Sequence, residues 1–246
     1  MRDRRGVHVV ECFCEFAGTA IQLGVGFSVV ALVSDRTSPA RISAPDLRFA
    51  IIGLTFGILA ALVAISPIGR RSGAHLNPAV TLGFWLRGQV HRHDLAAYAA
   101  SQALGALVAT SAFVSLWGSG AAEVNDAVTM PAASVGALGA VAIESALTAV
   151  LLGVLFAFLS SARLARWTPL AAVGALTVLI WAAARLTGAS FNPARSLAPA
   201  IVAGEFGGLW IYLLAPPLGA VIAAAAFGAL MPRQPMLTPK LCGEVG

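Results

Sequence analysis

The chain has 246 residues, of which 58% are hydrophobic and only 11% are charged, and its mean hydropathy is +0.83. A soluble domain carries about 25% charged residues. The composition therefore excludes a soluble globular domain, and the high apolar content excludes intrinsic disorder. A protein whose chain crosses a membrane several times remains.

The 16 basic and 11 acidic residues give a net charge of +5. Beyond Arg4-Arg5 and Arg70-Arg71 the sequence has no basic run, so we expect no nucleic-acid partner and place the excess in cytoplasmic loops. The apolar segments carry neither a nucleophile–base set nor the Cys and His spacing of a metal site. We therefore expect no enzymatic activity, no metal and no cofactor.

Six apolar segments reach the length of about 20 residues that a helix needs to cross a bilayer. Two further apolar segments are too short to span, so we expect them to enter the membrane and turn back. Irregular backbone at membrane depth is tolerated only where it is buried in protein or lines a wet cavity, so this pair predicts a pore or a binding site. The expected spans are residues 9–33, 47–65, 95–117, 135–159, 169–186 and 209–231, and the short segments are 78–86 and 193–202.

With six spans, 11 of the 16 basic residues fall on one side of the membrane, which also holds both termini, and five on the other. Basic residues are in excess in cytoplasmic loops, so both termini are expected in the cytoplasm. Since Lys240 is the single lysine and Ala is abundant, the composition favours a GC-rich bacterial genome and hence a bacterial inner (plasma) membrane.

The chain also contains an internal repeat. Residues 15–25 and 144–154 are identical at seven of 11 positions, and residues 73–79 and 188–194 at five of seven. Each half holds three spans, an odd number, so the second half must run upside down relative to the first. Inverted repeats place a site near the bilayer midplane between the halves. We expect a single transmembrane channel domain, residues 1–246, with repeats at about 9–117 and 135–231.

Each short segment opens with an Asn-Pro-Ala box. Asn is a favoured helix N-cap and Pro a favoured first helical residue. The inversion makes the two short helices meet at their N-termini near the midplane, where their positive ends repel cations. Each Asn oxygen caps its own helix, so both side-chain NH2 groups are predicted to act as donors in the centre of a pore. The boxes are Asn77, Pro78 and Ala79, and Asn192, Pro193 and Ala194.

Glu15 and Glu144 are acidic residues inside expected spans, at matched positions of the repeat. They could form a proton relay, as in a coupled transporter. Alternatively, each could accept hydrogen bonds from backbone N–H groups of a re-entrant segment, and the matched placement favours this structural role. His75, two residues before Asn77, is expected to pack against its loop rather than to gate by protonation.

The two boxes in their contexts, residues 72–81 and 188–196, and the Glu-x-x-Gly-Thr sequence of the first span resemble the aquaporin (major intrinsic protein) family over nearly the whole chain. The resemblance implies an all-α membrane protein with six transmembrane helices and two re-entrant half-helices. It also implies a passive channel surrounded by membrane lipid, usually a homotetramer with one pore per subunit. Arg195 would lie at the outer constriction, where it donates to permeants and opposes cations.

By the same resemblance, three further positions form the outer selectivity filter with Arg195. They lie 20 residues before the first box, and 12 and three residues before the second. Two small residues and one aliphatic residue at these positions are similar to the nodulin-26-like branch, whose wide filters pass glycerol, urea and uncharged metalloid acids. The three residues are Gly57, Ile180 and Ala189.

The helical register decides this filter, because a shift of one residue turns a helix face by about 100°. Such a shift would bring Phe56 or Trp181 into the filter and narrow it. The leading hypothesis is therefore a passive channel for water and small uncharged solutes that excludes ions and protons. The alternatives are a strictly water-selective aquaporin and an ion- or proton-coupled secondary transporter, which would need charged groups at the midplane.

Overall fold

The computed structural model describes residues 7–231, 236 and 237, and within these residues every regular element is a helix. Six helices are long and apolar enough to cross a membrane. The expected fold class is confirmed, with span ends within a few residues of those expected. The six are α1 (Val9–Ser34), α2 (Pro45–Ile65), α5 (Arg92–Trp117), α7 (Gly136–Leu159), α8 (Thr168–Thr187) and α10 (Leu209–Leu230).

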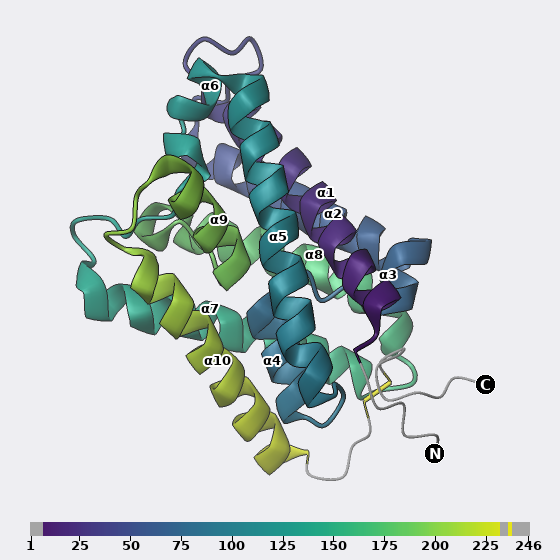
Figure 1. The fold of residues 1–246 in the computed structure, drawn as a ribbon. Coiled ribbons are helices and arrows are strands. Elements are labelled where there is room, and N and C mark those ends of the chain that lie inside the picture. The colour runs from purple at the N-terminus through teal and green to yellow at the C-terminus, as the bar shows by residue number, and fades with distance from the viewer. Residues whose placement is uncertain (1–6, 232–235, 238–246) are drawn as a thin grey trace.

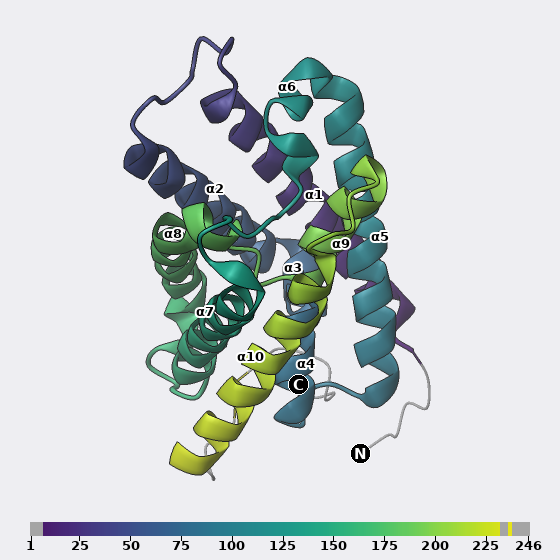
Figure 2. The ribbon, with the colours of Figure 1, turned by 90° about the vertical axis from the view of Figure 1, so that its left-hand side faces the viewer.

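The two short apolar segments are the helices α4 (Pro78–Leu86) and α9 (Pro193–Ala203), of nine and 11 residues. At a rise of about 1.5 Å per residue neither can cross a bilayer. In Figure 1, α9 lies in the upper half of the molecule and α4 in the lower half, and Figure 2 shows the same division. The bundle therefore surrounds two half-helices that enter it from opposite ends.

Two short helices and two 3₁₀ turns were not expected. The helix α3 (Pro67–Ser72) begins after Ser66, whose hydroxyl oxygen accepts a hydrogen bond from the Gly69 N–H at 3.3 Å. A Ser-Pro pair is a known helix start, so the signal was present in the sequence. The others lie in connections: α6 (Ser119–Ala122), η1 (Asn125–Ala127) and η2 (Ala165–Trp167).

The spanning helices pack in pairs, α1 along α5, α7 along α10 and α2 along α8 (Figures 1 and 2). All three pairs touch at backbone distance through a glycine, and in two of them the contacts are at matched positions of the repeat. A Cβ atom at Gly105 would lie 2.3 Å from the Phe16 carbonyl oxygen, and one at Gly219 would lie 2.3 Å from the Ser145 carbonyl oxygen. Small residues at such contacts let membrane helices approach closely, and here the same contact occurs once in each repeat.

The polarity of the bundle is inverted relative to a soluble protein. Large apolar side chains such as Leu104, Leu116 and Leu138 are exposed on the outside, whereas Glu15 and Glu144 are fully buried. Lipid can cover the apolar surface, but a buried carboxylate needs hydrogen-bond donors inside the protein. The interior therefore carries a polar network, and this network positions the functional site.

The glycine contact between α7 and α10 gives a stability prediction. Gly219→Ala is expected to lower the free energy of unfolding by about 1–3 kcal/mol, the usual cost of overpacking, because its methyl group collides with the Ser145 carbonyl. The control is Gly153→Ala, since a Cβ at Gly153 in α7 meets no atom within 4 Å. Thermal unfolding in detergent measures both variants, and equal midpoints would contradict the close-contact interpretation.

Candidate permeation pathway

Two cavities lie inside the bundle. The large cavity, of about 710 Å³, is lined by the loop before α4, and the small cavity, of about 150 Å³, is lined by parts of α2, α8 and the loop before α9. Four residues line both cavities and are here called the waist. The waist consists of Gln22, Leu176, Phe191 and Asn192.

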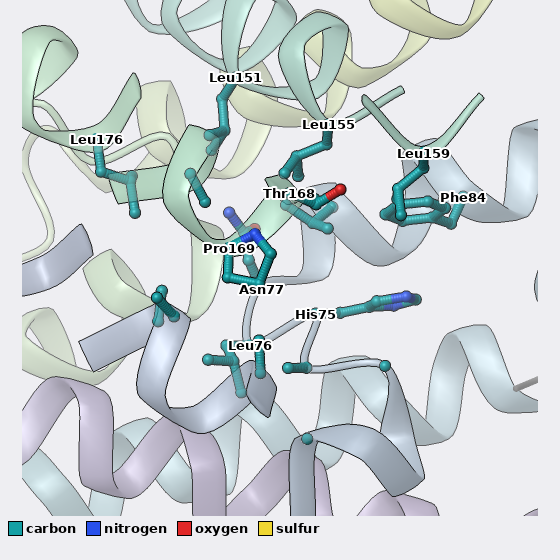
Figure 3. Close-up of a pocket in the computed structure, with 18 of the residues that line it drawn as sticks. His75, Leu76, Asn77, Phe84, Leu151, Leu155, Leu159, Thr168, Pro169 and Leu176 are labelled. Carbon is teal, nitrogen blue, oxygen red and sulfur yellow. The ribbon is translucent and has the colours of Figure 1, made fainter. Parts of the chain in front are cut away.

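Figure 3 shows how the large cavity is built. The side chains of Leu151, Leu155 and Leu159 come from α7 on one side. On the other side the chain runs through the loop 75–77 towards α4. Apolar side chains thus face a loop whose backbone is not helical. The passage therefore has one apolar wall of leucine side chains and one polar wall of loop backbone.

The loop before α4 is held by Glu15. Its carboxylate accepts hydrogen bonds from the backbone N–H groups of His75 and Leu76, at 3.0 and 2.7 Å. It also accepts one from the side-chain nitrogen of Gln102, at 2.8 Å. Because the helix ladder cannot satisfy these N–H groups, the carboxylate provides the partners that the membrane interior lacks.

Glu144 does the same for the loop before α9. It accepts from the N–H groups of Ser190 and Phe191, at 3.0 and 2.7 Å, and from the Thr187 hydroxyl at 2.6 Å. Each of the two buried carboxylates is therefore occupied by three donors, and each is tied to the loop of its own repeat.

Both loops have the same strained backbone. Ala74 and Leu76 have φ values of 52° and 55°, and the matching residues Ala189 and Phe191 have 46° and 36°. Residues other than glycine rarely adopt this left-handed region, and each such residue costs about 1–3 kcal/mol. The hydrogen bonds to the two carboxylates offset this cost and keep the loops from relaxing into helix.

Two tyrosines that line neither the large nor the small cavity also hold the loops. The sequence patterns did not indicate this role. The Tyr98 hydroxyl donates to the Ser72 carbonyl at 3.0 Å, and the Tyr212 hydroxyl donates to the Thr187 carbonyl at 2.6 Å. Both tyrosines are fully buried. The signal that could have found them is their placement: they are the only two tyrosines of the chain, and they occupy matched positions of the repeat.

The boxes cap their helices as expected. The Asn77 Oδ1 atom accepts from the Ala79 N–H at 2.8 Å. The Asn192 Oδ1 atom accepts from the N–H groups of Ala194 and Arg195, at 3.0 and 3.3 Å. Both asparagines have extended backbone, which is usual for an N-cap residue.

The side-chain nitrogens of the two asparagines cross between the repeats. The Asn77 Nδ2 atom donates to the Phe191 carbonyl at 2.8 Å, and the Asn192 Nδ2 atom donates to the Leu76 carbonyl at 3.0 Å. An amide nitrogen carries two hydrogens. One hydrogen of each asparagine therefore joins the two loops, and the second hydrogen takes no part in this bond.

A second matched pair closes each loop onto its half-helix. The His75 Nδ1 atom lies 3.2 Å from the Thr81 hydroxyl, and the Ser190 and Ser196 hydroxyls lie 2.6 Å apart. The His75 ring also stacks on Phe84, with 4.8 Å between the ring centres. The imidazole is thus packed within the loop, at the wall of the large cavity.

Arg195 lines the small cavity. Its Nη1 atom donates to the Ala127 carbonyl at 2.7 Å, and its guanidinium lies 5.2 Å from the centre of the Phe27 ring. Ala127 belongs to a connection in which Asn125 and Asp126 also have positive φ values, of 51° and 49°. This irregular connection between α5 and α7 therefore helps to orient the arginine.

The expected filter residues do not all reach one place. Ile180 and Ala189 line the small cavity together with Arg195, but Gly57 does not, and Phe56 lines it instead. A Cβ atom at Gly57 would lie 2.7 Å from the Val173 Cα atom, so this glycine faces the backbone of α8.

The position that lines the cavity is thus offset by one residue from the position obtained by counting back from the first box. The count cannot detect this offset, because the unexpected helix α3 lies between α2 and the box. One residue of shift turns the face of α2 by about 100°. Trp181, the other aromatic neighbour of an expected filter residue, has 48% of its side chain exposed on the outside of the bundle.

Six spanning helices surround two half-helices, and two cavities meet at a waist that carries the side-chain amides of Gln22 and Asn192. This arrangement defines a transmembrane channel. Residues 5–227 match the model of the family described as "Major intrinsic protein", and the chain belongs to this family. This confirms the resemblance seen in the sequence. The family is one of passive channels, so the protein is not an enzyme.

Several plant aquaporins are similar to the chain. Aquaporin NIP1-3 of Oryza sativa subsp. japonica is 36% identical over 217 residues, which cover 88% of this chain and 72% of the relative. Aquaporin NIP1-1 of Zea mays is 30% identical over 223 residues, covering 90% and 75%. These names agree with the nodulin-26-like branch.

Solved structures support the fold. An aquaglyceroporin from Plasmodium falciparum superposes with a TM-score of 0.75 at 23% identity, and covers 91% of this chain and 97% of its own. A pentameric formate channel superposes with a TM-score of 0.53 at 13% identity, covering 89% and 94%. At these identities the likeness concerns the fold alone.

Proposed function

We propose that the protein is a passive channel that passes water and small uncharged solutes such as glycerol and urea, and that it excludes ions and protons. The observation that carries this proposal is the meeting of two cavities at a waist that includes Asn192, with the amide nitrogens of both box asparagines joining the two loops at this point. Family membership supports a passive channel.

The waist favours neutral molecules for electrostatic reasons. The half-helices α4 and α9 begin at the two boxes, and each helix N-terminus carries roughly half a positive charge. A cation or a hydronium ion is repelled by these ends. A water molecule whose oxygen accepts hydrogen bonds from the asparagine NH2 groups cannot at the same time accept one from the next water. The single file of water molecules in the passage therefore cannot relay a proton through this point.

The small cavity fits a molecule that has both carbon and hydroxyl groups. Phe56 and Ile180 provide an apolar wall, and Arg195 provides donors. We propose that these residues and Ala189 form the outer selectivity filter. Since Phe56 occupies the wall that Gly57 would have left open, this filter is narrower than the sequence suggested.

The two alternatives make different demands on the site. A coupled transporter needs an ionisable group at the midplane that is free to bind an ion or a proton. Glu15 and Glu144 are each held by three donors, which favours a passive channel. A strictly water-selective aquaporin differs from our proposal only in reflecting glycerol and urea.

Stopped-flow light scattering on proteoliposomes tests the proposal. Vesicles with the protein are expected to shrink faster in sucrose than protein-free vesicles, and to re-swell in glycerol and in urea. Ionophores and membrane potential are expected to leave these fluxes unchanged, because no ion is coupled. Rapid shrinking in sucrose without re-swelling in glycerol or urea would instead establish the water-selective alternative. The same assay with boric acid and arsenite tests the permeability of metalloid acids.

The position of Phe56 gives a second prediction. Phe56→Ala is expected to raise the permeability of glycerol relative to water, because it removes the aromatic wall of the small cavity. Gly57→Ala is expected to leave this ratio unchanged and to lower stability, because its methyl group meets the α8 backbone. If instead only Gly57→Ala alters the ratio, the filter includes Gly57 and our assignment fails.

We further propose that the protein is a homotetramer in a bacterial inner membrane, with both termini in the cytoplasm. The 11-to-five bias of basic residues supports this orientation. Ser119 is an exposed residue next to α5. The variant Ser119→Cys, made in a Cys242→Ser background, is expected to react with an impermeant maleimide added outside whole cells. Labelling only after lysis would show that the termini lie outside and would contradict the proposed orientation. Native mass spectrometry is expected to give a mass of four subunits.

A further inference from the structure

Gln22 is the one polar side chain of a spanning helix at the waist. It comes from α1, it is 8% exposed, and it lines both the large and the small cavity. Its waist neighbours from the loops and from α8 are Asn192, Phe191 and Leu176. A molecule that passes from one cavity to the other must therefore pass this amide.

The orientation of the amide follows from its hydrogen bond. The Gln22 Nε2 atom donates to the Phe56 carbonyl oxygen at 3.4 Å, and a carbonyl can only accept. The NH2 group therefore points towards α2, and the amide oxygen points elsewhere. Among residues 7–231, 236 and 237, none donates a hydrogen bond to this oxygen. It is an acceptor without a protein partner, on a side chain that lines the passage.

We propose that Gln22 supplies the acceptor of a two-sided hydrogen-bonding site at the waist, whose donors are Asn192 at the waist and Asn77 beside it in the large cavity. The site binds small neutral solutes that both donate and accept hydrogen bonds, such as polyols and urea. This inference rests on the proposed function and identifies a residue that selects among its permeants.

The two asparagine donors alone would suit a hydroxyl group poorly, because the Leu76 and Phe191 carbonyls beside them each already accept a hydrogen bond from the opposite asparagine. The hydroxyl oxygen accepts from the asparagine amides, but its own proton then needs an acceptor. Water finds that acceptor in the next water of the file. A polyol fills the waist and displaces those waters, so its proton stays unpaired unless the protein accepts it, and an unpaired donor away from bulk water is costly. Gln22 lowers that barrier for the solute more than for water.

The repeat separates this role from a scaffolding role. Most of the residues that hold the loops occur at matched positions in both halves, as Glu15 and Glu144 and as Tyr98 and Tyr212 do. Gln102, which donates to Glu15, is an exception and has Pro216 as its counterpart. The position that matches Gln22 in the second half is Leu151, which lines the large cavity but not the small one. Gln22 therefore interrupts the symmetry of the scaffold at the point where both cavities meet.

The test replaces the amide with a side chain of similar length that accepts no strong hydrogen bond. Gln22→Met is expected to lower glycerol and urea permeability about five- to tenfold, the factor of one lost hydrogen bond. Water permeability of the same vesicles is expected to stay near the wild-type value, which also shows that the variant is folded.

The matched control is Gln89→Met. The Gln89 Nε2 atom also donates to a backbone carbonyl at 3.4 Å, that of Arg87, but Gln89 lines neither cavity. Its fluxes are expected to equal those of the wild type. Equal loss of water and solute flux in Gln22→Met would make Gln22 structural and overturn the inference, as would glycerol flux at the wild-type level. Wild-type vesicles that conduct water but no glycerol would overturn the proposed function itself and this inference with it.

Discussion

The hydrogen bonds that the re-entrant loops donate to the two buried carboxylates are the interaction on which the rest of the structure depends. A chain that turns back inside a membrane leaves N–H groups without water and without a helix ladder. Glu15 and Glu144 each accept two of these N–H groups. They thereby hold the left-handed residues of the loops in place and let the half-helices begin near the centre of the bundle.

The central passage follows from this arrangement. Once both loops are held, the cap residues Asn77 and Asn192 face each other's loop, and each donates to a carbonyl of the other repeat. The two halves are therefore joined by the same amide groups that we propose as donors to a permeant. A substitution at either asparagine affects the joint and the passage together, so flux changes in such variants need a parallel measurement of stability.

Some residues of the protein occur at matched positions in both repeats, and others have no counterpart of the same kind. The paired tyrosines, the paired carboxylates and the glycines Gly105 and Gly219 repeat in both halves. Apart from the paired box asparagines, the residues that we propose to select among solutes do not repeat: Arg195 and Phe56 line only the small cavity, and Gln22 has a leucine as its counterpart. Matched positions thus hold most of the loop backbone and carry the box asparagines, and the unmatched Arg195, Phe56 and Gln22 are the residues that we propose to distinguish one solute from another.

The sequence by itself determined the membrane class, the six spans, the inverted repeat and the capping role of the two boxes. These features depend on composition, segment length and local backbone preferences, which are readable along the chain. Only the tertiary structure decided that Phe56 rather than Gly57 lines the small cavity, and that Gln22 lies at the waist. The physical reason is that the facing of a helix depends on its rotation against its neighbours, which the intervening loop and close glycine contacts set.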